Sequence, residues 1–332
     1  MGRFIQILIV LLALQVILFV ALDRTQPNLA AVSERAAMVD IDEKAVTRLV
    51  ITSSAASEVI LEKQSDTWGI SNSDNFPADQ DKVAELISKL QMIKRGLPVA
   101  TSAAGMKRFR VAEDAFERHI QIYAGDTPAV DVFLGTSPRS RMVHVRSGQD
   151  TAVYETQMGL YHAPGTVPEW LDTTLVQIAY PDIQSISVPG VLTLERMPTV
   201  PAEGDDGAGK PARRPAVIWG TPDTLADNQM IEQDGADALA RKISTIRYRD
   251  VLGKTLQPGY GLSPPALNIE VQSSDGRVLT YAIGVIEGEE NYVLKASNRD
   301  EYFQIADYLA KGLLDAADRE MIFVPKRERP DG

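Results

Sequence analysis

Hydrophobic and polar residues alternate in short runs along most of the chain, and these runs predict β-strands interrupted by a helix. Alternating segments occupy 45–52 and 58–63, and the pair Trp68-Gly69 follows them. A period of two residues, with turn-forming residues between the runs, is typical of an antiparallel meander. The period changes to helical spacing after Asp79, which is a suitable N-cap residue. One face of this helix carries Val83, Leu86, Ile87, Leu90 and Ile93.

The same order of runs returns in the second half of the chain. From Asp182 onward, two strand-like runs lead to another Trp-Gly pair and then to a helical pattern. Matched positions lie at a nearly constant separation, 151 residues for two tryptophans (219 − 68) and 149 for two glycines (284 − 135). The matched pairs are Trp68 with Trp219, Leu90 with Ile243, Phe109 with Tyr260, Gly135 with Gly284, and Tyr154 with Phe303. A repeat of this length indicates duplicated domains, because solenoid repeats are much shorter.

These patterns predict an α+β protein of two tandem related units, each an antiparallel sheet with one main helix. We expect the units over 44–178 and 182–325, after a linker over 25–43. The separation between matched residues rises from 133 (194 − 61) to 151 (219 − 68), so the second unit carries an insert. The Pro- and Gly-rich segment 201–215 falls within it and predicts a mobile loop. A polar tail over 326–332 ends the chain.

A long uncharged run precedes the two units. It covers residues 4–22, and at 1.5 Å per residue a helix of this length would span about 28 Å, close to the hydrocarbon thickness of a bilayer. We therefore expect a single transmembrane helix within an anchor over 1–24. Arg3 at its start favours a cytoplasmic N-terminus, which puts the rest of the chain outside the cytoplasm. A signal peptide cleaved near 28–32 is the alternative interpretation.

Composition narrows the classes of function. A formal net charge of -11 over 332 residues argues against a nucleic-acid partner, because phosphate binding needs a basic surface. The chain has no cysteine. This absence removes disulfides, thiolate metal ligands, cysteine nucleophiles and lipid attachment through an N-terminal cysteine.

Neither of two common enzyme motifs is present in complete form. Gly204, Gly209 and Lys210 match the start of a phosphate-binding loop, but Pro211 occupies the position of the metal-binding Ser or Thr. The loop also lacks the preceding hydrophobic strand that the mechanism requires. No G-x-S-x-G nucleophile elbow occurs in the sequence. A Ser-His-Asp arrangement built across the fold stays open, because such triads are recognised by geometry and not by order.

Histidines and acidic clusters do not form a metal motif. The three histidines are His119, His144 and His162, and no two of them have the close helical spacing of a metalloprotease site. The acidic segments 73–81 and 287–291 lack the oxygen spacing of a calcium loop. We interpret the histidines as hydrogen-bonded strand or loop residues, and the acidic segments as a helix-entry loop and a turn. The sequence assigns no catalytic, cofactor-binding or metal-binding residue, and we expect no cofactor.

The chain contains Trp-Gly-Ile at 68–70, Pro-Ala-Asp at 77–79, Tyr-Gly-Leu at 260–262, Ile-Gly at 283–284 and Tyr-Val at 292–293. These motifs resemble those of a bacterial family, domain of unknown function 4340. The likeness covers most of the chain beyond Asp23, counting both copies, and the first copy departs from the family pattern at Phe109-Arg110-Val111. The resemblance implies a membrane-anchored auxiliary protein associated with ABC-type export systems. The family supplies no catalytic residues that could be transferred to this chain.

Two classes of function follow as hypotheses. The leading one is a non-enzymatic module on the outer side of the bacterial inner membrane, anchored by one helix and bound to an inner-membrane complex such as an ABC-type exporter. The other is a periplasmic hydrolase or ligand-binding protein that acts on an envelope molecule. A flat apolar patch would favour the first class, and a deep pocket with convergent titratable groups would favour the second.

Overall fold

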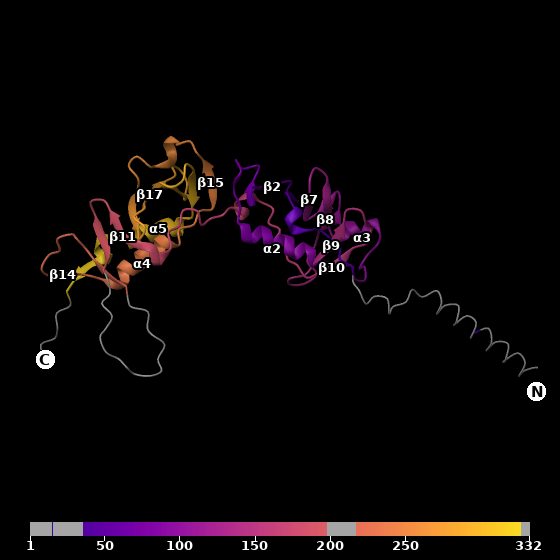
Figure 1. Ribbon diagram of the computed structural model, residues 1–332, viewed down its shortest axis with the longest axis horizontal. Helices are drawn as coiled ribbons and strands as arrows, with labels where there is room; N and C mark the ends of the chain where they lie inside the picture. The colour runs from indigo at the N-terminus through magenta and orange to yellow at the C-terminus, as the bar shows by residue number, and fades with distance from the viewer. Residues whose placement is uncertain (1–14, 16–35, 198–216, 327–332) are drawn as a thin grey trace, which may run out of the picture. The chain divides into compact units, whose positions relative to one another are not determined.

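A computed structural model describes residue 15, residues 36–197 and residues 217–326 (Figure 1). The chain divides into two compact units, Met1–Trp170 and Leu171–Gly332. Apart from residue 15, the expected anchor over 1–24 lies outside the described residues, as do the insert over 201–215 and nearly all of the tail. Within the described part, none of the helices combines the length and apolar character needed to cross a bilayer.

The first unit is built on one sheet of eight strands in which every neighbouring pair is antiparallel. Buried side chains alternate along its central strands, as the period of two residues predicted. In spatial order the strands are β10 (Tyr154–Thr156), β9 (Val143–Ser147), β8 (Pro128–Leu134), β7 (Arg118–Tyr123), β1 (Arg48–Ser53), β2 (Glu58–Gln64), β3 (Thr67–Ile70) and β4 (Phe76–Pro77).

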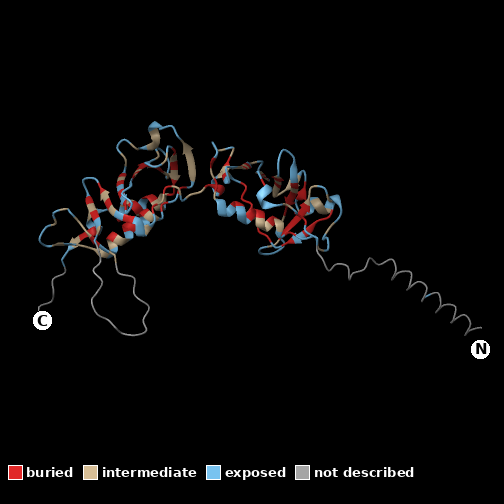
Figure 2. Cartoon of the chain, viewed as in Figure 1, coloured by how far each residue is buried: buried red, intermediate tan, exposed pale blue. Residues whose placement is uncertain are grey.

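Helix α2 (Gln80–Gln91) is the main helix of the first unit. Asp79 caps it by accepting a hydrogen bond from the backbone N–H of Lys82, as the sequence predicted. Its buried residues are Val83, Leu86, Ile87 and Leu90, which are part of the buried core coloured red in Figure 2. The shorter elements are η2 (Glu43–Ala45), α3 (Ala103–Arg108), the hairpin β5 (Val111–Ala112) and β6 (Ala115–Phe116), η3 (Leu160–His162) and η4 (Val167–Trp170).

The second unit also contains an eight-stranded antiparallel sheet. Its strands in spatial order are β13 (Ile218–Gly220), β12 (Leu192–Met197), β11 (Ile183–Val188), β16 (Leu267–Ser273), β17 (Val278–Val285), β18 (Tyr292–Ala296), β19 (Tyr302–Ile305) and β15 (Asp250–Gly253). The remaining elements are η5 (Tyr180–Asp182), β14 (Gln229–Ile231), α4 (Gln233–Ser244), η6 (Pro258–Tyr260), α5 (Asp307–Ala316), α6 (Arg319–Ile322) and β20 (Phe323–Pro325).

Seven strands of each sheet follow the same order. The order β3-β2-β1-β7-β8-β9-β10 in the first unit corresponds to β13-β12-β11-β16-β17-β18-β19 in the second. Trp68 lies in β3 and Trp219 in β13, while α2 and α4 begin at Gln80 and Gln233. The fold is therefore α+β with antiparallel sheets, as predicted, and the matched pairs Trp68 with Trp219, Leu90 with Ile243, and Tyr154 with Phe303 occupy corresponding elements.

The second unit differs from the prediction in two respects. It has a further helix of ten residues, α5, beyond the one main helix expected from the sequence. Residues 171–178, placed at the end of the first repeat from the sequence, belong to the second unit. Tyr281 donates a hydrogen bond to the carbonyl of Val176, and Asn298 donates one to the carbonyl of Leu175. These carbonyl contacts join the segment to β17 and to the turn before β19, and no periodicity in the sequence signals them.

Candidate functional site

His119 is held between two neighbouring strands of the first unit. Its Nε2 atom lies 2.7 Å from Oδ1 of Asp131 on β8. Its ring stacks on Phe133 with 4.2 Å between ring centroids and an interplanar angle of 3°. One face and one nitrogen of this imidazole are thus engaged by neighbours in the sheet.

His144 and His162 are also engaged, each by local backbone. His144 is buried in β9, and its Nδ1–H donates to the carbonyl of Thr136 at 2.8 Å. In His162, Nδ1 lies 3.1 Å from the backbone nitrogen of Gly159 and 3.0 Å from its carbonyl oxygen. Its Nε2 lies 3.4 Å from Oε1 of Glu85 on α2.

The structure does not bring the three histidines together. Among the residues it describes, no three or more histidine and acidic side chains are arranged to hold a metal ion. The acidic segment 287–291 lies between β17 and β18, and Asp79 of the other segment caps α2. The acidic segments therefore occupy the turn and the helix entry for which the sequence analysis proposed them.

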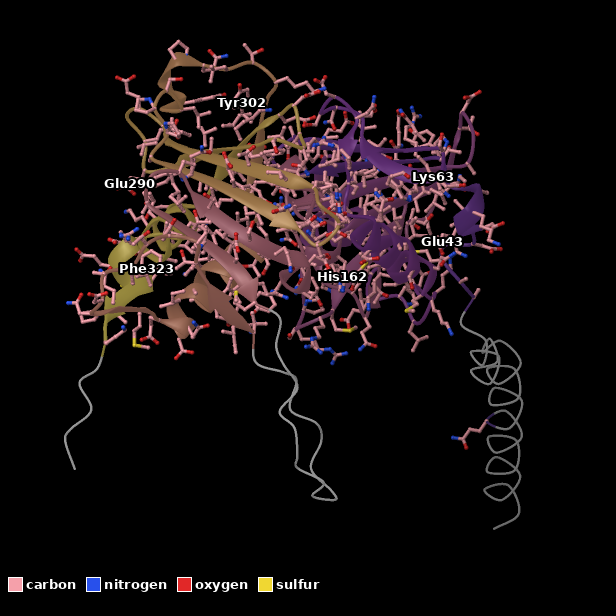
Figure 3. The ribbon with its side chains drawn as sticks, turned by 60° about the vertical axis from the view of Figure 1, so that its left-hand side comes forward. Glu43, Lys63, His162, Glu290, Tyr302 and Phe323 are labelled. Atoms are coloured by element: carbon pink, nitrogen blue, oxygen red, sulfur yellow. The ribbon has the colours of Figure 1, made fainter. Side chains whose placement is uncertain are left out.

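Several hollows indent the first unit, and we call one of them the α2–β10 hollow. It encloses about 700 Å³ and includes the edge of His162, which is labelled in Figure 3. Two large side chains at this site are well exposed, Met92 at 63% and Tyr161 at 65%. The lining residues are Glu85, Lys89, Met92, Lys94, Arg141, Met142, Glu155, Thr156, Gln157, Met158, Tyr161 and His162. The hollow therefore combines thioether and aromatic surface with charges of both signs.

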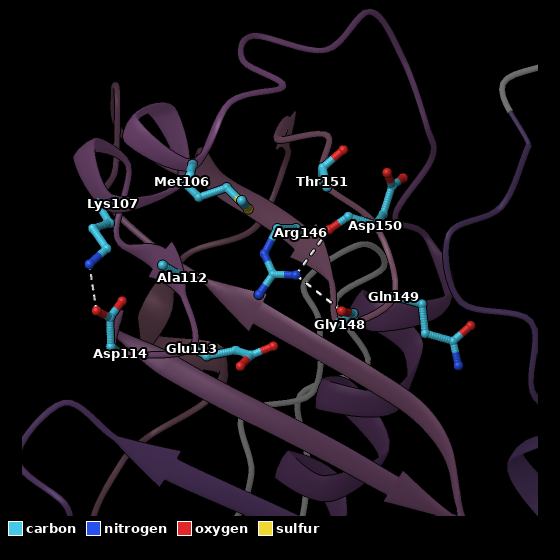
Figure 4. Close-up of a pocket in the computed structure, with 11 residues that line it drawn as sticks. Met106, Lys107, Ala112, Glu113, Asp114, Arg146, Gly148, Gln149, Asp150 and Thr151 are labelled. Atoms are coloured by element: carbon cyan, nitrogen blue, oxygen red, sulfur yellow. Dashed lines mark hydrogen bonds and ion pairs between the residues drawn. The ribbon is translucent and has the colours of Figure 1, made fainter.

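A second hollow encloses about 430 Å³, and we call it the Arg146 hollow (Figure 4). Helix α3, the β5–β6 hairpin and the loop between β9 and β10 surround it. Its lining residues are Ala103, Met106, Lys107, Ala112, Glu113, Asp114, Arg146, Gly148, Gln149, Asp150 and Thr151. At the rim, Nζ of Lys107 lies 2.6 Å from Oδ2 of Asp114, and this hydrogen bond lowers the pKa of the Asp114 carboxyl.

Arg146 is the buried charge of this hollow. The residue is 4% exposed, and its guanidinium lies 4.5 Å from the centre of the Phe133 ring. Its Nε–H donates to the carbonyl of Val111 at 2.6 Å, and Nη1 donates to the carbonyls of Gly148 and Asp150 at 3.2 and 3.0 Å. Burial lowers the pKa of Arg146, because a charged group loses the solvation of bulk water.

The sequence analysis did not identify Arg146. Its position in an alternating strand predicts an ordinary polar residue, and nothing local shows that the loop after β9 folds over its side chain. The comparison of the two copies contains a signal, because a basic residue recurs after 149 residues, at Lys295 (295 − 146). A repeated charge within a buried strand would have singled out this position.

The comparisons with known proteins are sparse. A family model described as "Domain of unknown function (DUF4340)" matches residues 68–265. No curated protein and no solved structure matches the chain.

Proposed function

The chain belongs to the family of the domain of unknown function DUF4340, and from that premise we propose that it is a non-enzymatic binding module that holds a protein partner. We further propose that an N-terminal helix anchors it in the bacterial inner membrane, with both units on the periplasmic side. The partner is an inner-membrane complex, and the family resemblance described from the sequence favours an ABC-type exporter.

The observation that carries the proposal is the surface of the α2–β10 hollow. Met92 and Tyr161 line this hollow, and each residue is more than half exposed. Lys89, Lys94 and Arg141 supply positive charge, and Glu85 and Glu155 supply negative charge. Tyrosine, methionine and arginine are enriched in protein–protein interfaces, where an apolar centre lies within a polar rim.

A membrane anchor would allow even a weak interface to hold the partner. If the chain and its partner share one membrane, tethering raises their effective concentration and the interface is occupied even at modest affinity. The uncharged run over 4–22 supports this part of the proposal. The net charge of -11 also disfavours the main alternative class of macromolecular partner, nucleic acid.

The engaged histidines favour binding over bond-making chemistry. Each imidazole has contacts that fix its orientation, and those of His144 and His162 involve backbone groups of their own loops. A histidine that acts as a general base must reach the proton that it removes in a bound substrate. The runner-up, a hydrolase, is favoured by histidine–carboxylate contacts, the 2.7 Å approach of His119 to Asp131 and the 3.4 Å approach of His162 to Glu85 in the α2–β10 hollow.

The proposal is tested by recovering the partner from membranes. We expect the full chain to co-purify an inner-membrane complex, as identified by mass spectrometry, and Tyr161→Ala to reduce the recovery at least tenfold, because aromatic anchors dominate interface energy. Tyr308→Ala is the matched control, since Tyr308 is 68% exposed on the second unit. Equal recovery with both variants would contradict the role of the α2–β10 hollow.

Two further variants distinguish a requirement for the membrane anchor from a requirement for histidine catalysis. Replacing residues 1–24 by a cleavable signal peptide should impair the cellular phenotype while both units stay folded. His119→Asn, which installs the residue found at the corresponding position 268, should leave the phenotype unchanged. Loss of the phenotype in a folded His119→Asn protein, with full activity of the released form, would favour the hydrolase.

A further inference from the structure

Arg146 has donor groups that its own fold does not use. A guanidinium carries five N–H donors, one on Nε and two on each terminal nitrogen. Nε bonds to the carbonyl of Val111, and Nη1 is shared among the carbonyls of Ser147, Gly148 and Asp150. No hydrogen bond joins Nη2 to any other residue that the structure describes. Both of its donors are therefore left for a group within the hollow, toward which Figure 4 shows the guanidinium projecting.

The second unit shows which part of this arrangement the fold requires. Lys295 occupies the position of Arg146 in the corresponding strand, and its Nζ donates to the carbonyl of Arg299. Arg299 corresponds to Asp150 by the same separation of 149 residues (299 − 150). Lys295 also lies over an aromatic ring, that of Tyr302, at 5.0 Å from its centroid (Tyr302 is labelled in Figure 3). A lysine thus suffices to contact the loop, and arginine adds the Nε contact with Val111 and the unused Nη2.

The charges around Arg146 are close but not paired with it. The acidic groups that act on its guanidinium are Glu113, Asp131 and Asp150, in that order of strength. None of them forms an ion pair with Arg146 within the described chain, and Glu113 has no ion pair there either. A buried cation without a paired anion is costly, because the lost solvation is not replaced.

We propose that the Arg146 hollow binds a small zwitterion, an amino acid or a short peptide with free termini. Its carboxylate accepts hydrogen bonds from Nη2 of Arg146, and its ammonium group lies against the carboxylate of Glu113. Ala103, Met106 and Ala112 contact the apolar part of the ligand. The volume of about 430 Å³ falls within the usual range for small-molecule sites. This site goes beyond the proposed function, because it shares no residue with the α2–β10 hollow.

The charges that line the hollow favour a zwitterionic ligand over a simple anion or a simple cation. The lining holds two cations, Lys107 and Arg146, and three acids, Glu113, Asp114 and Asp150. A simple anion would pair with the guanidinium and meet repulsion from the three acids. A simple cation would pair with Glu113 and leave the buried guanidinium without a counter-charge. A zwitterion pairs both groups and adds no net charge.

Four dipeptides that differ only at their ends test the proposal. They are alanyl-alanine, N-acetyl-alanyl-alanine, alanyl-alanine amide and N-acetyl-alanyl-alanine amide. The full chain in detergent micelles is titrated with each one, and binding is followed by saturation-transfer NMR and calorimetry. We expect alanyl-alanine to bind at least tenfold more tightly than each blocked form, because each block removes one charge-assisted contact. Absence of binding by alanyl-alanine at millimolar concentration, or equal binding of the uncharged form, would overturn the proposal.

Two variants locate the binding. Arg146→Lys keeps a loop contact like that of Lys295 and removes Nη2 together with the Nε contact with Val111, so we expect affinity for alanyl-alanine to fall by about tenfold or more. Lys295→Arg, the reciprocal change in the second unit, should leave the affinity unchanged. Should Arg146→Lys fail to fold, Glu113→Gln at the exposed rim replaces it. Glu113→Gln should lower the affinity for alanyl-alanine and leave the affinity for N-acetyl-alanyl-alanine unchanged. Unchanged affinity for alanyl-alanine in either folded variant would refute the site.

Discussion

Two glutamines hold the tryptophan strands of the two units in the same way. The side-chain amide of Gln80 accepts a hydrogen bond from the backbone N–H of Trp68 at 2.8 Å and donates one to its carbonyl at 2.9 Å. Gln233 makes the same pair of bonds to Trp219 at 2.8 and 2.9 Å. Each glutamine is the first residue of its main helix, so one amide group joins the helix to the strand. The amide acts as a neighbouring peptide group would at a sheet edge.

Removing either amide should destabilise its own unit. We expect Gln80→Ala and Gln233→Ala each to lower the free energy of unfolding by about 1–3 kcal/mol, because a partly buried N–H loses its acceptor and a C=O loses a donor. Urea denaturation followed by circular dichroism measures the change. Gln64→Ala, at an exposed end of β2, is the control and should stay within about 0.5 kcal/mol of the wild type. If Gln80→Ala lowers the free energy of unfolding no more than Gln64→Ala does, water replaces the hydrogen bonds of the Gln80 amide.

At the scale of elements, the end of β8 and its counterpart in β17 lie against another stretch of backbone. A Cβ atom added at Gly135 would overlap the carbonyl oxygen of Phe109, and one added at Gly284 would overlap that of Tyr260. The N–H of Thr136 donates to the same Phe109 carbonyl at 2.9 Å. These strands therefore require glycine for close backbone approach, and neither glycine is required for a positive φ.

Alanine at Gly135 or Gly284 should disrupt the close packing of the two backbone segments. We expect Gly135→Ala and Gly284→Ala each to cost about 3 kcal/mol or more, because the backbone carbonyl and not a flexible side chain has to move. Gly259→Ala is the matched control, since its added Cβ would meet nothing closer than Cβ of Glu287 at 3.7 Å. Thermal unfolding and hydrogen exchange of β8 and β17 report the effect. Wild-type stability of Gly135→Ala would show that the crossing backbone shifts freely.

At the scale of the whole molecule, buried tyrosines connect the segment after Trp170, with which the second unit begins, to the rest of that unit. The phenol of Tyr281 donates to the carbonyl of Val176 at 2.7 Å, and that of Tyr248 donates to the carbonyl of Asp172. Burial raises the pKa of both phenols above the ordinary tyrosine value. The folded chain therefore favours their neutral forms, whereas the unfolded chain ionises them as the pH passes the ordinary tyrosine pKa of about 10.

This difference predicts an alkaline loss of stability. A group whose folded pKa is raised stabilises the fold fully below its unfolded pKa and progressively less above it, so the free energy of unfolding should fall as the pH rises beyond about 10. Tyr281→Phe should cost about 1 kcal/mol at pH 8, through the lost hydrogen bond, and should flatten the decline above pH 10. Urea titrations at pH 8 and pH 11 compare the two proteins. An equal decline in both would assign the pH dependence to other groups.

Much of the fold followed from local pattern, and the candidate site did not. The alternation at 45–52 and the helical spacing after Asp79 predicted β1 and α2, because a strand and a helix each repeat within a few residues. The contact between Arg146 and the carbonyl of Val111 joins residues 35 positions apart (146 − 111). The bond between Gln80 and Trp68 likewise depends on how α2 lies against β3. Contacts of this kind have no period, so only the two matched copies could have hinted at them.

The sequence by itself determined the family, the α+β class and the order in which matched residues recur, because each depends on residue types and spacings along the chain. The tertiary structure alone decided which charges are buried and which polar groups are left without a partner. Within one copy of the repeat, nothing in the sequence distinguishes Arg146 from a solvated strand arginine, because its burial arises only when the β9–β10 loop and α3 enclose it. The physical reason is that solvation is a property of the whole neighbourhood in space. A hollow with an unused guanidinium nitrogen exists only when distant segments assemble around it.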